Sequence, residues 1–88
     1  MAVVFVPALL RELTGGRSQV SVGGASVREV VDKLEAEYPG LRARLVGGGA
    51  LLPSLSVAVD GEVSPLGLME KVGETSEVHF LTAISGGV

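Results

Sequence analysis

Short segments in which every second residue is apolar recur along the chain, and this spacing is typical of β-strands with one buried face. In the last of them, Val78 and Phe80 face one side, and His79 and Leu81 face the other. Alternation of this kind, or a high content of β-branched residues, predicts strands at 2–6, 19–22, 56–59 and 77–84.

A single segment has the 3.6-residue spacing of an amphipathic helix. Its apolar positions are Val27, Val30, Val31, Leu34 and Tyr38. Ser26 and Glu29 form a capping box at its start, and Pro39-Gly40 ends it. Charged residues four positions apart predict two ion pairs on the exposed face, Arg28 with Asp32 and Glu29 with Lys33.

The segments between these elements contain weaker signals. Residues 8–14 have weak helical character, and residues 41–46 add a helical turn. Leu9 and Leu10 are interpreted as core residues, the alternative being that they extend a partner-binding surface. The three glycines at 47–49 predict a flexible surface loop. Asp60-Gly61 predicts a tight hairpin that returns through a short strand at Glu62 and Val63.

This order of elements predicts an α+β fold of the β-grasp (ubiquitin-like) type. A mixed sheet of four to five strands would carry one main helix, and a right-handed crossover would place the last strand beside the first. We expect one domain over residues 1–84, followed by a C-terminal tail at 85–88 that contains Gly86-Gly87. The last strand would be central, so the tail would leave from a rigid base.

Composition narrows the classes of function. The 88 residues contain no cysteine, one histidine and three aromatic residues, so catalytic side chains are scarce and we expect no enzyme, no bound cofactor and no metal site. The net charge of −3 argues against a nucleic-acid partner. Residues 45–88 carry a net charge of −4, which favours a partner with a basic docking face. Without a basic start or a long apolar run, we expect a cytoplasmic protein with no membrane span.

The dipeptide Gly86-Gly87 after the last strand is the main candidate for chemistry. A frayed end is the alternative interpretation, because thirteen glycines make such pairs common. An extended segment 82–87 would reach roughly 20 Å, and glycines without a Cβ pass through a narrow channel. A terminal carboxylate that is adenylated by ATP could accept sulfide, which gives a thiocarboxylate, or a lysine amine, which gives an amide. Since the chain has no cysteine, it could not carry sulfur as its own persulfide, and the terminus is the only carrier atom that the sequence offers.

The whole chain resembles the MoaD/ThiS group of ubiquitin-like sulfur carriers. The resemblance rests on VVFVPALLRELTGG, SVREVVDKLEAEYPGLRARL, LSVAVDGE and GETSEVHFLTAISGG, and the first stretch looks most like the cysteine-synthesis (CysO-like) branch. It implies that an E1-like enzyme adenylates Gly87 with ATP and that a thiocarboxylate forms there. The implied recipient is a PLP-dependent cysteine synthase, the large subunit of molybdopterin synthase, or a thiazole-forming enzyme.

Val88 departs from the family pattern, in which the active form ends at the second glycine. Our hypothesis is that a JAMM-type zinc metalloprotease removes Val88 and frees the carboxylate of Gly87. The alternative is that Val88 marks a relative without this function.

We expect partners to bind beside the tail, at the candidates His79, Leu81, Ala83 and Ile84, with Ser85 continuing toward Gly86 and Gly87. An ordinary exposed histidine on a strand is the alternative interpretation of His79. Two other functions remain open from the sequence. One is a covalent protein modifier that ends in an isopeptide bond to lysine, and the other is a non-covalent β-grasp interaction module with an inert tail.

Overall fold

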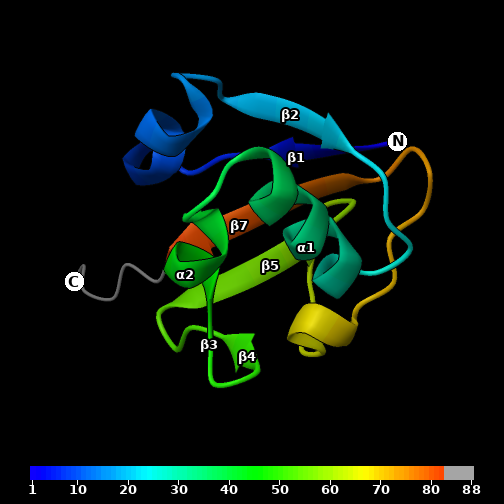
Figure 1. Cartoon of the computed structure of the whole chain (residues 1–88). Helices are drawn as coiled ribbons and strands as arrows, with labels where there is room; N and C mark the ends of the chain where they lie inside the picture. Colours follow the sequence, from blue (N-terminus) through cyan, green and yellow to red (C-terminus); the bar gives the residue numbers. More distant parts are fainter. Residues whose placement is uncertain (83–88) are drawn as a thin grey trace.

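A five-stranded mixed sheet with one main helix across it forms the molecule (Figure 1). The computed structural model describes residues 1–82, so the expected domain boundary after residue 84 and the tail at 85–88 lie outside the described residues. The predicted β-grasp architecture is confirmed. In the spatial order β2-β1-β7-β5-β6, the strands are β2 (Gln19–Val22), β1 (Ala2–Phe5), β7 (Glu77–Thr82), β5 (Leu55–Val59) and β6 (Glu62–Val63).

Strand β7 lies at the centre of this sheet. It pairs in parallel with β1, with Val4 opposite Val78, and antiparallel with β5, with Val57 opposite Phe80. A parallel pair needs a long crossover, which the chain makes through helix α1 (Val27–Glu37). The prediction that the last strand lies beside the first is therefore confirmed.

The core lies between α1 and the inner face of the sheet. Its side chains come from alternate strand positions and from the predicted apolar stripe of the helix. The buried members on β1, β2, β5, β7 and α1 are Ala2, Val4, Val20, Val22, Val57, Val78, Phe80, Val27, Val30, Val31 and Leu34. On β1, β2 and β7, buried core positions therefore alternate with half-buried or exposed ones, whereas both residues of β6 are exposed.

The capping box at the start of α1 is present. The backbone N–H of Glu29 donates to Ser26 Oγ at 3.2 Å, and Glu29 Oε1 accepts from the backbone N–H of Ala25 at 2.9 Å. The reciprocal hydrogen bond thus goes to Ala25, one residue before the cap. These bonds satisfy backbone donors that a helix start otherwise leaves unpaired.

The two predicted ion pairs on α1 are wrong. Asp32 instead pairs with Arg42 of the short helix α2 (Leu41–Leu45), and the two pairs found in residues 1–82 do not include Arg28 or Lys33. The neighbouring carboxylate of Glu35 accepts from the backbone N–H groups of Arg42 and Gly40, and these hydrogen bonds lower the pKa of Glu35. The carboxylates of α1 therefore tie α2 to it.

The connections are more ordered than the sequence indicated. Residues Ala8–Thr14 form the 3-10 helix η1, and Gly67–Met69 form a second one, η2. The predicted flexible loop at the three glycines is wrong, because β3 (Val46–Gly47) and β4 (Ala50–Leu51) form a hairpin there. Gly48 and Gly49 make its turn with φ angles of 63° and 82°, which glycine adopts without a steric penalty.

Of the two leucines predicted to be buried in Ala8–Thr14, Leu10 joins the core, whereas Leu9 is 74% exposed, so the predicted burial of Leu9 is wrong.

The turn between β5 and β6 is linked to the start of β7. Asp60 and Gly61 have φ angles of 53° and 86°, as the predicted two-residue hairpin requires. The carboxylate of Asp60 accepts from the backbone N–H of Glu77 at 3.0 Å and from Ser76 Oγ at 2.8 Å. These hydrogen bonds favour the ionised form and lower the pKa of Asp60.

Truncating Leu34, which is 1% exposed at the centre of α1, should strongly destabilise the fold. We expect Leu34→Ala to lower the free energy of unfolding by about 2–5 kcal/mol, because it removes buried methyl groups and leaves a cavity. The matched variant Leu9→Ala should change it by less than about 0.5 kcal/mol. Urea denaturation of both proteins measures the difference, and equal losses would contradict the described packing.

Replacing Asp60 with asparagine should change the pH dependence of stability. Because the folded pKa lies below the unfolded one, the carboxylate stabilises the fold fully above the ordinary carboxylate range near pH ~4. This stabilisation is lost as the pH falls through the folded pKa. The difference in unfolding free energy between the natural protein and Asp60→Asn should therefore shrink as the pH is lowered from about 7 to about 3.

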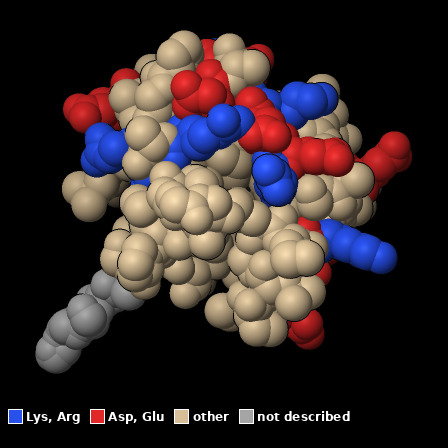
Figure 2. Space-filling view, turned by 60° about the horizontal axis from the view of Figure 1, so that its bottom comes forward, with Lys and Arg blue, Asp and Glu red and all other residues tan. Residues whose placement is uncertain are grey.

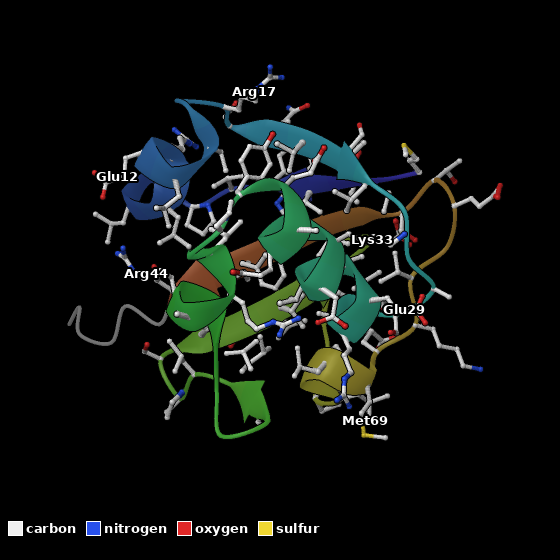
Figure 3. All side chains as sticks on the ribbon, in the orientation of Figure 1. Glu12, Arg17, Glu29, Lys33, Arg44 and Met69 are labelled. Atoms are coloured by element: carbon white, nitrogen blue, oxygen red, sulfur yellow. The ribbon has the colours of Figure 1, made fainter. Side chains whose placement is uncertain are left out.

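Thermal unfolding followed by circular dichroism across this pH range measures that difference. Glu12→Gln is the matched control, because the Glu12 carboxylate accepts no hydrogen bond from any residue in 1–82 (Figure 3). The same pH trend in both variants would show that the hydrogen bonds of Asp60 are not its cause.

Candidate functional site

The side of the sheet opposite α1, called here the outer face, carries the two described residues of the predicted partner site. On β7, Val78 and Phe80 are buried in the core, whereas His79 is half-buried and Leu81 is 40% exposed. The predicted division of this strand into an inner and an outer side is confirmed. The remaining predicted site residues, Ala83, Ile84, Ser85, Gly86, Gly87 and Val88, lie outside the described residues.

The strand registers align apolar residues across this face. Phe5 of β1 lies opposite His79, His79 lies opposite Ala58 of β5, and Ala58 lies opposite Val63 of β6. Leu81 lies two residues further along β7 on the same side. We call Phe5, Ala58, Val63, His79 and Leu81 the outer patch. Val63 is 62% exposed, so the patch offers apolar area to a partner.

His79 is held flat within the patch. Its ring stacks on Phe5 with centroids 4.1 Å apart and planes inclined by 5°. Its Nε2 lies 3.8 Å from Glu77 Oε1, an ion pair when the imidazole is protonated. The stacking restricts the imidazole to one orientation, so His79 presents an apolar ring face and a polar edge in a fixed place.

Sequence reasoning missed three members of this patch, Phe5, Ala58 and Val63. Alternation along β1 places Phe5 on the face opposite Val4, but only the parallel register with β7 places it beside His79. Val63 comes from a two-residue strand, too short to show alternation. Only the hairpin register places it opposite Ala58.

The C-terminal segment follows a strand inside the sheet. Strand β7 lies between β1 and β5, as the sequence predicted. Its first three residues, Glu77, Val78 and His79, pair with β1, whereas its end at Thr82 lies beyond that register and pairs with Leu55 of β5. Two ladders of backbone hydrogen bonds therefore hold the first half of β7, and the ladder with β5 holds the half that leads to residue 83.

The rest of the described surface gives little sign of other chemistry. Figure 2 shows Lys and Arg side chains interspersed with Asp and Glu in one band, with an uncharged area beside it, so this view has no large basic field. Within residues 1–82, no group of three or more His, Asp or Glu side chains is placed to hold a metal ion. None of the helices in this range is long and apolar enough to cross a membrane.

A cleft of about 670 Å³ lies between the β5–β6 hairpin and the segment before β7. Two pairs of its polar side chains hold the fold together. Ser76 donates to Asp60, and Ser64 donates to Glu70 Oε1. The hydrogen bonds in this cleft therefore hold the two sides of the hairpin connection together.

Comparison with known proteins gives relatives over the whole length of the chain. The sulfur carrier protein CysO of Mycobacterium tuberculosis is 33% identical over 89 residues, which cover 96% of each chain. The crystal structure of the BexX/CysO complex of Amycolatopsis orientalis matches with a TM-score of 0.92 and 34% identity, over 99% of this chain and 100% of that one.

The crystal structure of SAMP1 from Haloferax volcanii matches less closely, with a TM-score of 0.74 and 30% identity over 98% of both chains. The model of the ThiS family matches residues 4–87. The resemblance to the MoaD/ThiS group is thereby confirmed, as is its CysO-like branch. On these grounds the chain belongs to the ThiS family.

Proposed function

We propose that this protein is a sulfur carrier whose acyl group at Gly87 is loaded with sulfur by another enzyme. The observation that carries the proposal is the family match, which extends to Gly87 and no further. The similarity to CysO over 96% of the chain supports the same function. In this role the protein is acted upon by enzymes in the cytoplasm and is not an enzyme itself.

The chemistry needs an activated carboxylate. A carboxylate oxygen of Gly87 attacks the α-phosphorus of ATP, and pyrophosphate leaves, which gives an acyl adenylate. Hydrosulfide then attacks the acyl carbon, and AMP leaves, so that a thiocarboxylate remains on Gly87. An E1-like enzyme supplies the ATP site for this step, so the carrier needs no bound cofactor of its own.

The sequence continues beyond Gly87 with Val88, so the carboxylate must first be released. Hydrolysis of the Gly87–Val88 peptide bond adds one water and gives the free carboxylate of Gly87. We assign this step to a JAMM-type zinc metalloprotease. A β-branched residue at the reacting position would crowd the acyl carbon, because its branched Cβ lies next to it.

The outer patch is the surface we assign to docking with the activating and recipient enzymes. The patch includes His79 and Leu81 of β7, the strand that leads to the C-terminal segment, and it also includes the exposed Val63 of β6. Aromatic and apolar residues of this kind form the centres of protein interfaces. The similarity to CysO favours a PLP-dependent cysteine synthase as recipient over the large subunit of molybdopterin synthase.

Covalent protein modification is the second candidate, because this chain is also similar to SAMP1, whose relative from Methanosarcina acetivorans is called a small archaeal modifier protein. The two functions share the acyl adenylate. A lysine amine of a target would then displace AMP and form an isopeptide bond, in place of the thiocarboxylate. The product formed in cells therefore separates the two functions.

Loading should depend on Gly87 and on the removal of Val88. We expect the 1–87 protein, incubated with the activating enzyme, ATP and sulfide, to gain the mass of one sulfur in exchange for one oxygen. The Gly87→Ala variant of this protein should load about five- to hundredfold more slowly, since an added methyl in a tight channel costs about 1–3 kcal/mol. Intact-protein mass spectrometry measures the loaded fraction.

Two controls accompany this loading experiment. Ser85→Ala in the 1–87 protein should still load, and the full chain with Val88 should not. Efficient loading of Gly87→Ala, or of the full chain without cleavage, would refute the assigned site. In host cells, a ladder of higher-mass conjugates in place of the thiocarboxylate would favour the modifier function.

A charge within the outer patch should weaken docking without unfolding the protein. We expect Leu81→Glu to raise the Kd for the activating enzyme by roughly tenfold, the effect of losing one central interface contact. Met69→Glu introduces the same side chain on η2, where Met69 is 79% exposed, and should leave the Kd unchanged. Isothermal titration measures both, and equal affinity of the two variants would exclude the outer patch as the docking surface.

A further inference from the structure

Strand β2 forms one edge of the sheet, and half of its backbone hydrogen-bonding groups face away from β1. The backbone N–H of Val6 donates to the carbonyl of Ser18, and Val4 lies opposite Val20. In an antiparallel ladder the paired groups alternate, so Ser18, Val20 and Val22 bond to β1. Gln19 and Ser21 therefore direct their N–H and C=O groups to the open side, and no group in residues 1–82 bonds to them.

A groove lies beside the C-terminal half of this edge, between β2 and α1. It has a volume of about 210 Å³, and its walls include Ser21, Val22, Lys33, Ala36 and Glu37. Gly23 adds no side chain to it, which leaves the groove open next to the unpaired backbone groups of β2. An extended segment placed along β2 could therefore form backbone hydrogen bonds and insert side chains into the groove.

Two cations flank the edge. Arg17 precedes the first residue of β2, and Lys33 of α1 lies near the last residue of β2 (Figure 3). The Nζ of Lys33 is 3.8 Å from the point where a Cβ on Gly23, the residue after β2, would lie. Glu37 is the only acidic residue among the described residues that line the groove. Acidic groups at both ends of an extended segment would complement Arg17 and Lys33.

We propose that the free edge of β2 binds an extended segment of another protein, with acidic ends and an apolar residue that enters the groove. The segment adds to the sheet as a sixth strand. Only a backbone in extended conformation satisfies the donors and acceptors of Gln19 and Ser21 in sequence, which defines the class of ligand.

A second copy of this chain fits the edge less well. The side chains of β2 that point toward the helix layer, Val20 and Val22, are already buried in its own core. A paired copy could therefore offer only backbone groups and the polar side chains of Gln19 and Ser21, and nothing of it could enter the groove. Four-residue strands alone also bury far less than the roughly 1,200 Å² of a stable interface.

Nuclear magnetic resonance with a synthetic peptide tests the proposal on the full chain. The probe is Ac-Asp-Val-Thr-Val-Thr-Asp-NH2, which alternates apolar and polar residues between acidic ends. We expect the largest amide shifts, and slowed hydrogen exchange, at Gln19 and Ser21. The same peptide methylated on its four central backbone nitrogens should cause neither change, because it cannot form the ladder.

A pair of charge-reversal variants tests the groove. Lys33→Glu should weaken binding of the probe peptide about two- to fivefold, the range expected for one exposed ion pair. Arg44→Glu makes the same change of charge on α2, away from the groove, and should have a smaller effect (Figure 3). Unchanged amide spectra elsewhere show that both variants remain folded.

Several results would overturn the proposal. One is the absence of shifts at Gln19 and Ser21, and another is equal binding of the methylated peptide. Shifts confined to Phe5 and His79 would place the peptide on the outer patch. Self-association of the protein alone through β2, seen as concentration-dependent shifts at the same amides, would assign the edge to a second copy.

Discussion

The pairing of β7 with β1 and β5 at once is the constraint on which the rest of the structure depends. Because β7 is hydrogen-bonded on both sides, its alternation fixes two surfaces together. Val78 and Phe80 close the core under α1, and His79 and Leu81 must then face the outer side. The ladder with β5 extends to Thr82, from which the chain continues toward Gly87. One strand, β7, thus both closes the core of the domain and leads to the C-terminal segment.

Polar groups in this small domain mainly fix connections. Asp60 joins the β5–β6 turn to the residues before and at the start of β7, and Glu35 holds the chain where it leaves α1 for α2. Both carboxylates accept backbone N–H groups that would otherwise lack partners in tight turns. The apolar residues supply most of the stability by burial. The carboxylates of Glu35 and Asp60 fix where the segments between elements lie.

The sheet offers two kinds of recognition on separate strands. The outer patch of β1, β5, β6 and β7 recognises through side chains, with the stacked rings of Phe5 and His79 at its centre. The edge of β2 has few apolar side chains outside the core and would recognise through its backbone at Gln19 and Ser21. These surfaces share no residue. A carrier built this way can be held at one place while its C-terminal segment is handled at another.

The sequence by itself determined the main helix, the longer strands and the fold class, because these elements have a hydrophobic period or β-branched residues, with local caps and turns such as Ser26 and Asp60-Gly61. It also indicated Gly87, through motif resemblance. Contacts between distant segments were decided only by the tertiary structure. Asp32 pairs with Arg42, and not with Arg28, because α2 folds back onto α1. Phe5, Ala58, Val63 and His79 become neighbours only through strand registers, which depend on how the whole sheet packs and not on any local pattern.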